Sequence, residues 1–437
     1  MKLRNSSGAA LAILVAINIL NFYDRNIAGA VAEPMRKEFH LSDTQIGLLA
    51  SVFTWLYAVI GVPLGNIADR WSRKKLLAGG MVIWSLLTGL TALAFTYAML
   101  LFTRLGFAVG EAAVAPTATS WIGDLFPGSK RARPLALFML GVPVGGALAY
   151  FFSGPIAQAF GWRVAMVVAA APAALLIFPL LKLHEPERGA AETTREQQYT
   201  GWKAVKIFGR IPTFWWIVAS GALLNFNMYA LGLFIPAFLS RVHSIGLAQA
   251  GIATGIIYLT GGVAGSLAAG WLGDHAAISR GNGRMVWSAS LAIVGAPLAY
   301  LGVEATSLVM VVVFLAIFYG TLCSYYGLVY ASIQDIVAPS MRGTAMAVYF
   351  MAMYLCGASF GPLITGRLSD LMALRMAHAA GSAIVTEAFK AVGLQQAMLI
   401  LPVITLALAA VLFIGSRTIL GDLARRETAM KTAAARA

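Results

Sequence analysis

The chain has 437 residues, of which 59% are hydrophobic and 11% charged, and its formal net charge is +14. This composition excludes an ordinary soluble domain and predicts many apolar spans of about 20 residues each. The basic residues lie mostly in short loops between apolar segments, which is typical of cytoplasmic loops and argues against a nucleic-acid-binding face.

Hydropathy along the chain predicts twelve membrane-spanning helices. The longest polar interruption runs from Lys182 to Arg210 and divides these helices six and six. We therefore predict an all-α membrane protein with an N-terminal half (1–182), a cytoplasmic linker (183–212), a C-terminal half (213–420) and a cytoplasmic tail (421–437). The predicted spans are 9–32, 44–67, 76–94, 97–121, 134–159, 163–182, 213–239, 246–272, 285–303, 306–332, 343–372 and 392–416.

The distribution of Lys and Arg predicts the orientation. With the N-terminus inside, 23 of these residues lie on the cytoplasmic side and six on the opposite side. Because loops rich in Lys and Arg stay in the cytoplasm, we predict a protein of the plasma (inner) membrane with both termini cytoplasmic.

Three charges lie deep in apolar spans: Asp24 and Arg25 in the first, and Glu111 in the fourth. Each such charge costs about 2.5–3.5 kcal/mol on insertion scales and is usually retained for function. A carboxyl group in these surroundings can exchange a proton near neutral pH, so we predict that Asp24 and Glu111 couple transport to protons. The alternative is a static buried ion pair that fixes helix register.

Two arginines are candidates for binding an anionic group of a substrate. Arg25 can pair with a phosphate. Arg104 lies seven residues before Glu111, which places both on about the same helix face. Arg104 either anchors an anion or extends to the membrane interface, and the sequence favours neither reading.

Two sequence elements recur in the two halves. A Gly-x-x-x-Asp segment after the second span returns 205 residues later after the eighth, and an Asp-to-Arg segment after the fourth returns 211 residues later after the tenth. Such parallel six-helix repeats are typical of one large transporter architecture. We predict that these segments form a gate, although topology alone would also explain their basic residues; the gate residues are Gly65, Asp69, Arg70, Arg73, Asp124, Arg131, Asp274 and Arg342.

The C-terminal half has no carboxyl group in its membrane core before Asp335, but it is rich in aromatic and amide side chains. This pattern suggests that the first half handles protons and the second packs against an amphiphilic substrate. Ordinary bundle packing explains each residue equally well. The predicted cavity residues are Asn21, Asn225, Tyr229, Tyr319 and Tyr326.

Several motifs resemble known families. Gly65-x-x-x-Asp69-Arg70-x-x-Arg73-Lys74-Lys75 resembles the loop signature of the major facilitator superfamily, and Arg104-x-x-x-x-x-Gly110 resembles its fourth-helix motif. Asn21-Phe-Tyr-Asp24-Arg25 and Gly110-Glu111-Ala112 are similar to segments of the spinster family of lysolipid carriers. That resemblance implies sphingosine-1-phosphate or a lysophospholipid as substrate, with Asp24, Arg25 and Glu111 in coupling and headgroup handling.

We therefore predict a proton-coupled secondary transporter that moves an amphiphilic lysolipid by alternating access. Its expected partners are this lipid, protons and the membrane lipids; we expect a monomer that needs no nucleic acid, cofactor or metal. The alternatives are a proton symporter of small organic anions such as sugar acids, and a drug or amphiphile efflux carrier. The few amides in the core spans favour the amphiphile.

An enzyme is not expected. The five histidines are scattered over loops and span ends without the spacing of metal ligands. The sequence also lacks a Gly-x-x-x-x-Gly-Lys-Ser/Thr loop, so ATP hydrolysis does not drive the protein.

Overall fold

The computed structural model describes residues 7–127, 130, 132–187, 207–279, 281–337 and 341–434, and this part of the chain is almost entirely helical. Eleven of its helical segments are long and apolar enough to cross a membrane. A further long helix, α4 (Arg73–Thr91), is more polar because it begins with Arg73, Lys74 and Lys75. With α4, these segments account for the twelve predicted spans.

The first six spans are formed by eight helices, since span four is broken near its middle and span five near its start. A short helix that the sequence analysis missed, α2, follows the first span. In chain order the helices are α1 (Ser7–Ala30), α2 (Ala32–Glu38), α3 (Asp43–Arg70), α4, α5 (Tyr97–Glu111), α6 (Val114–Leu125), α7 (Ala132–Met139), α8 (Gly141–Phe160) and α9 (Trp162–Lys182).

Spans eight and eleven are each interrupted by one π-helical turn, η2 (Ile257–Gly261) and η4 (Tyr354–Ala358). The last span continues to residue 434, well beyond its predicted end at 416 and through most of the predicted tail. The α-helices of the last six spans are α11 (Pro212–Val242), α12 (Leu247–Ile256), α13 (Gly262–Ser279), α14 (Gly283–Glu304), α15 (Leu308–Ile336), α16 (Arg342–Met353), α17 (Phe360–Ala379), α18 (Glu387–Met398) and α19 (Ile400–Ala434).

Polar caps define where α3 and α4 begin. The Ser42 hydroxyl accepts from the Gln45 amide while the Gln45 side chain accepts from the Ser42 amide, so both groups of a capping box are satisfied. The Ser72 hydroxyl likewise accepts from the amide of Lys75 at the start of α4. The first cap thus lies at the start of the α3–α4 hairpin, and the second lies in its loop, within the predicted gate segment.

Close packing divides the described chain into two compact units. The first comprises the described residues within Met1–Arg195, Gly232–Leu259 and Pro362–Leu394, and the second comprises the remainder. The first unit therefore contains the first six spans together with α12 and segments of α11, α17 and α18. The division of the sequence into halves at residues 182 and 213 stays a prediction.

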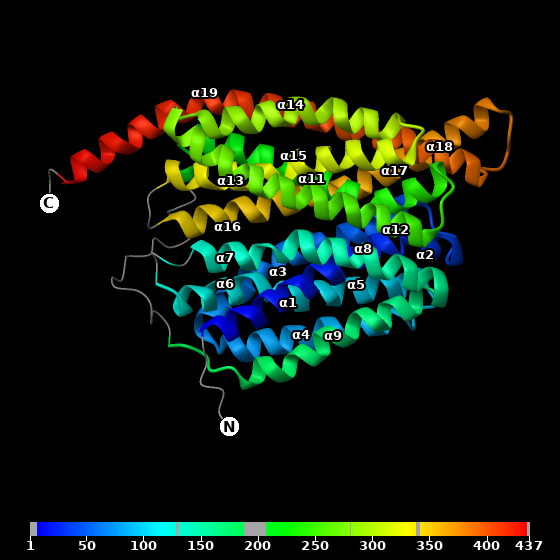
Figure 1. Cartoon of the computed structure of the whole chain (residues 1–437), viewed down its shortest axis with the longest axis horizontal. Helices are drawn as coiled ribbons and strands as arrows, with labels where there is room; N and C mark the ends of the chain where they lie inside the picture. Colours follow the sequence, from blue (N-terminus) through cyan, green and yellow to red (C-terminus); the bar gives the residue numbers. More distant parts are fainter. Residues whose placement is uncertain are drawn as a thin grey trace. The chain divides into compact units, whose positions relative to one another are not determined.

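In the first unit, α1 packs along α8, and α4 lies against α5 and α9 (Figure 1). Gly145 of α8 faces the backbone carbonyl of Ile19, where a Cβ atom would clash, so the glycine permits this close approach. The core between these helices includes the fully buried rings of Trp84 and Trp121.

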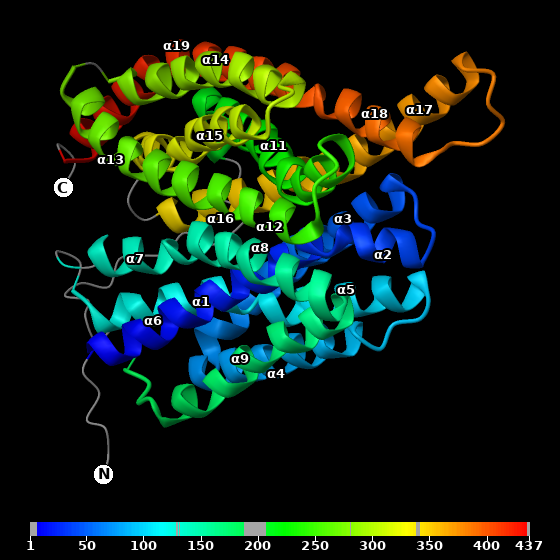
Figure 2. The ribbon, with the colours of Figure 1, turned by 45° about the vertical axis from the view of Figure 1, so that its right-hand side comes forward.

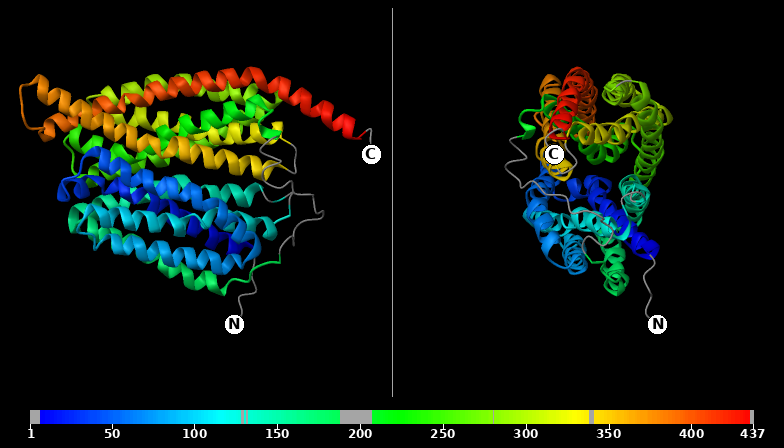
Figure 3. Two further views of the ribbon diagram at one scale, coloured as in Figure 1. Left: turned by 180° about the vertical axis from the view of Figure 1, so that it is seen from behind. Right: turned by 90° about the vertical axis from the view of Figure 1, so that its left-hand side faces the viewer.

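In the second unit, α14 packs against both α15 and α19 (Figure 2). Gly261 and Gly265 let α13 approach the backbone of α15. The C-terminal turns of α19 project past the ends of α14 and α15 (Figure 3).

Candidate functional site

The charged residues predicted in the first and fourth spans come together inside the first unit. Asp24 and Arg25 lie in the C-terminal third of α1, and Glu111 is the last residue of α5. Asp24 and Glu111 are fully buried, and the Arg25 side chain is almost so. The structure therefore holds two carboxyl groups and a guanidinium in an apolar bundle.

Arg25 and Glu111 form a direct ion pair. Nε and Nη2 of Arg25 donate to the same Glu111 oxygen, Oε2, at 3.1 and 3.0 Å. The guanidinium carbon also lies 4.4 Å from the ring centroid of Tyr57 and 4.8 Å from that of Phe22. The arginine is thus held by one carboxylate and by aromatic rings, an arrangement that stabilises a buried cation.

Asn21 supports this pair from the preceding turn of α1. Its side-chain oxygen accepts from Nη2 of Arg25 at 3.4 Å. Asn21, a predicted cavity residue, thus contacts the buried charges of the first unit.

Asp24 has a different environment, although it is adjacent to Arg25 in sequence. Within the described residues, neither of its carboxyl oxygens accepts a hydrogen bond. The indole N–H of Trp84 is likewise buried without a hydrogen bond among the described residues. The charges of Glu111 and Arg104 also act on this carboxyl group.

Arg104 lines a small cavity together with Asp24. The cavity has a volume of about 10 Å³ and is also bounded by Thr88, Thr91 and Phe107. This is the lower limit of the space that one water molecule needs. Arg104 is buried, and its role as an anion anchor stays a prediction.

The predicted cavity residues of the second half lie in the second unit, where they form hydroxyl–amide and ring contacts. Tyr326 donates its hydroxyl to the Asn225 side-chain oxygen at 3.3 Å, and the Asn225 amide donates to the carbonyl of Gly221 at 2.9 Å. Tyr229 packs edge-on against the ring of Tyr354. Tyr319 is buried in the core of the second unit.

In the predicted gate, the structure brings together Arg73 and Asp124. The fully buried Arg73 guanidinium pairs with Asp124 and also with Glu185, at 3.2 Å from Nε to Oε1. Glu185 further accepts from the Ser72 hydroxyl at 2.6 Å and from the Arg73 amide at 2.8 Å. Partial burial raises the pKa of Glu185, but these hydrogen bonds outweigh it, so its pKa lies below the ordinary value.

Of the other predicted gate residues, the structure describes Gly65 and the side chains of Arg70 and Arg342. Arg70 is exposed, Gly65 lies beside Pro116, and Arg342 donates to the carbonyl of Gln334 at 3.2 Å. Arg131 and the side chains of Asp69 and Asp274 lie outside the described residues, as does the part of the predicted linker from 188 to 206.

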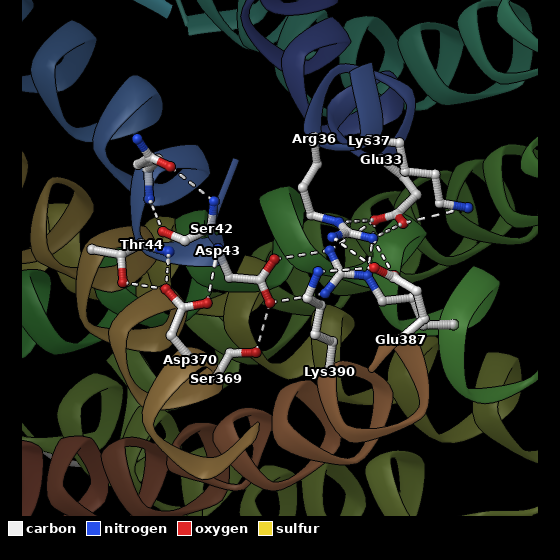
Figure 4. A network of polar contacts seen from close by, with 12 residues as sticks. Glu33, Arg36, Lys37, Ser42, Asp43, Thr44, Ser369, Asp370, Glu387 and Lys390 are labelled. Atoms are coloured by element: carbon white, nitrogen blue, oxygen red, sulfur yellow. Dashed lines mark hydrogen bonds and ion pairs between the residues drawn. The ribbon is translucent and has the colours of Figure 1, made fainter. Parts of the chain in front are cut away.

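Two charged groups were missed by the sequence analysis. Glu185 follows the sixth span directly, but the sequence does not show that this segment turns back onto α4. The second group is an ion-pair network centred on Arg241, where α3 begins (Figure 4). Its members flank the spans, and charges in that position are expected from topology alone.

Comparisons with known proteins agree with this architecture. The sequence profile of the Major Facilitator Superfamily matches residues 14–362. The chain belongs to the major facilitator superfamily. This membership confirms the predicted fold class, and the superfamily consists of transporters rather than enzymes.

Among other members of the superfamily, an MFS-type efflux pump of Mycolicibacterium smegmatis is 32% identical over 367 residues, covering 83% of this chain and 84% of the pump. A probable L-galactonate transporter of Escherichia coli is 24% identical and covers 84% of each chain.

A solved structure gives the subtype. The crystal structure of a bacterial homologue of the human lysosomal transporter Spinster, inward-facing and unoccupied, matches with a TM-score of 0.86. The two sequences are 27% identical, and the match covers 96% of this chain and 98% of the other. The chain is therefore an integral membrane transporter of the spinster type within the superfamily, as predicted.

Proposed function

We propose that this transporter moves an amphiphilic lysolipid with an anionic headgroup, by alternating access coupled to protons. The observation that carries this proposal is the buried Arg25–Glu111 pair. A guanidinium is well suited to a phosphate headgroup, and here it is already occupied by a carboxylate.

Competition for Arg25 would couple the substrate to a proton. While Glu111 is ionised, it holds two N–H groups of Arg25. A proton added to Glu111 removes its negative charge, which weakens the pair and leaves the guanidinium for an anionic headgroup. Loss of the proton restores the pair and displaces the headgroup, so binding of the anion and of the proton support each other.

Asp24 and Arg104 are proposed as a second proton site. A fully buried carboxylate without a hydrogen bond is costly to keep charged, so this environment favours a proton on Asp24. Arg104 shares the small cavity and supplies a nearby positive charge when that proton leaves. The proposed coupling residues are thus Asp24 and Glu111, and the headgroup residues are Arg25 and Arg104.

The remaining parts of the proposal rest on sequence. An alkyl chain would contribute about 0.8 kcal/mol for each CH₂ group that it buries. The predicted substrate contacts of the second half stay Asn225, Tyr229, Tyr319 and Tyr326.

The location of the protein is proposed from its charge distribution. The ratio of 23 to six basic residues supports a plasma (inner) membrane protein with both termini in the cytoplasm. We also propose that it acts as a monomer.

A second candidate is a proton symporter of small organic anions, because a probable L-galactonate transporter is among the relatives. Once it is released from Glu111, the Arg25 guanidinium would bind a sugar carboxylate as well as a phosphate. The relative named as an efflux pump supports outward movement of the substrate. The lysolipid carries an apolar tail, and the small organic anion does not.

Flux into proteoliposomes tests this proposal. We expect a labelled lysosphingolipid phosphate to move faster under a pH gradient, and Glu111→Gln to abolish that dependence because glutamine keeps the shape but cannot titrate. Glu304→Gln, at the exposed end of α14, is the matched control and should behave as wild type. Uptake of a sugar acid without lipid flux would instead identify an organic-anion symporter.

Arg25→Ala tests the headgroup role separately. We expect flux of the phosphorylated lipid to fall on the order of tenfold more than flux of its unphosphorylated analogue, because charge-assisted hydrogen bonds to the phosphate are lost. Equal loss for the two analogues would show that Arg25 is structural.

A further inference from the structure

A charged network lies where α3 begins, at the end of that helix opposite the basic loop Arg70–Lys75. We call it the Arg241 network, and all its members belong to the first unit. Four acidic and four basic side chains take part, so it is electrically balanced. They are Glu33, Arg36, Lys37, Asp43, Arg241, Asp370, Glu387 and Lys390 (Figure 4).

Arg241, near the end of α11, is the hub of this network. Its guanidinium donates to both oxygens of Asp43 at 2.8 Å and to Glu33 at 2.8 Å. The exposed fraction of each of these three side chains is 7% or less. The planar guanidinium of Arg241 donates to two buried carboxylates at once, which is a strong arrangement. The ammonium group of a lysine would not reproduce this geometry.

Two further contacts join the same helices. Arg36 of α2 pairs with Glu33 in its own helix and, at 2.5 Å, with Glu387 of α18. Asp370 of α17 accepts from the backbone amides of Asp43 and Thr44 at 3.0 and 2.8 Å, so it caps α3 from another part of the chain. Hence α2 and α3 are tied to α11, α17 and α18.

Glycines show that these helices are in direct backbone contact. A Cβ atom on Gly47 of α3 would meet the carbonyl of Pro362, and one on Gly366 of α17 would meet the carbonyl of Asp43. The network therefore sits on a tightly packed junction between segments from opposite ends of the sequence.

Parting this junction would affect the two carboxylates differently. Glu33 would keep Arg36, because that pair lies within α2. Asp43 would lose Arg241 and the hydroxyl of Ser369, which donates to it at 2.6 Å. Parting the junction would therefore leave Asp43 without a cation, whereas Glu33 would keep one.

We propose that the Arg241 network is a lock that holds the α2–α3 end of the transporter closed and must break for that end to open. The lock rests on the alternating-access part of the proposed function but requires neither a lipid substrate nor proton coupling. Arg241 acts as a positioning residue, because it holds helices together and is not assigned to the substrate.

Distance measurements between spin labels at His40 and Ala383 test the lock in the full-length protein, with Cys323→Ala and Cys356→Ser as background. Both label sites are exposed and belong to the first unit. Arg241→Gln leaves Glu33 and Asp43 buried without their shared cation, so we expect the ratio of long to short distances to rise on the order of tenfold.

The matched control is Glu38→Gln. Glu38 pairs with Arg163 at 2.6 Å near the same end, but this pair connects α2 with α9 and does not involve α11, α17 or α18. We expect it to leave the distances unchanged. Asp43→Asn is a second test should Arg241→Gln not fold, and the charge exchange Asp43→Arg with Arg241→Asp should restore the short distance.

An unchanged distance distribution in both Arg241→Gln and Asp43→Asn would overturn the lock. An equal shift in Glu38→Gln would also overturn it, because any ion pair at this end would then have the same effect. Neither outcome bears on the Arg25–Glu111 proposal, which is tested by flux.

Discussion

At the scale of single residues, the two buried carboxyl groups of the first unit differ in what faces them. Glu111 accepts two hydrogen bonds from Arg25, whereas the described structure shows none to Asp24. Removing one partner of a buried ion pair leaves the other charge uncompensated, whereas neutralising an unpaired carboxyl group removes a cost. The two acids should therefore respond in opposite ways to substitution.

We predict that Asp24→Asn leaves the thermal unfolding midpoint in detergent unchanged or higher, because the amide keeps the shape of a protonated carboxyl group and cannot become charged. Glu111→Ala should lower stability by about 3–5 kcal/mol, because the Arg25 guanidinium stays buried without its partner. Tryptophan fluorescence during heating measures both midpoints.

The double variant Glu111→Ala with Arg25→Ala is the control for this comparison. It should recover part of the loss, since both charges are gone. Similar destabilisation by Asp24→Asn and Glu111→Ala would contradict the assignment of different roles to the two acids.

At the scale of elements, the segment after the sixth span is fastened to the start of α4. Glu185 accepts from the Ser72 hydroxyl and from the amides of Arg73 and Lys74. A carboxylate at a helix N-terminus satisfies backbone amides that have no partner within the helix. This contact connects the predicted gate loop to the beginning of the predicted linker.

We predict that Glu185→Gln speeds amide hydrogen exchange in the first turn of α4, with little change in the first turn of α5, where Thr96 provides a separate cap. Because the pKa of Glu185 is lowered in the folded protein, its contribution is present above about pH 4.5. It is lost as the pH falls through the lowered value, so wild type and variant should converge in acid. Equal protection in both proteins at neutral pH would contradict this role.

The Arg241 network should not respond to pH near neutrality. Burial raises the pKa of Glu33, but the hydrogen bond from Arg36 and the charge of Arg241 outweigh it, so the pKa lies below its ordinary value. The other charged groups around Glu33 are Lys37 in the same helix, Asp43 across Arg241 and Glu387 across Arg36.

A carboxyl group whose pKa is lowered by folding stabilises the folded form at pH values above its ordinary pKa. This stabilisation is lost only in acid. We therefore predict the same distance between the labels at His40 and Ala383 at about pH 5.5 and about pH 8. A shift over this range would mean that the network itself senses protons. Any pH dependence of transport should instead arise from Asp24 and Glu111.

At the scale of the whole molecule, hydropathy predicted the spans because about twenty apolar residues in sequence are required to cross a bilayer. The motifs and the family match identified the fold, and the buried charges of α1 and α5 stood out because they are costly in apolar surroundings. Pairing of Arg25 with Glu111 rather than Asp24 was left open by the sequence, since it depends on how two distant helices face each other.

The features that were missed have three physical causes. Glu185 and Arg241 lie at span ends, where a charge costs little and carries no signal in hydropathy. The π-turns η2 and η4 and the short helix α2 depend on tertiary packing rather than on local composition. The continuation of α19 was missed because its last turns are polar and were assigned to a tail.

Proton uptake on binding tests the central claim, the competition of Glu111 and an anionic substrate for Arg25. Calorimetric titration of the transporter with a lysosphingolipid phosphate, in two buffers of different ionisation enthalpy, counts the protons taken up. We predict uptake of about one proton per bound anion in wild type near neutral pH, and loss of that uptake in Glu111→Gln. The same proton count in both proteins would contradict the account.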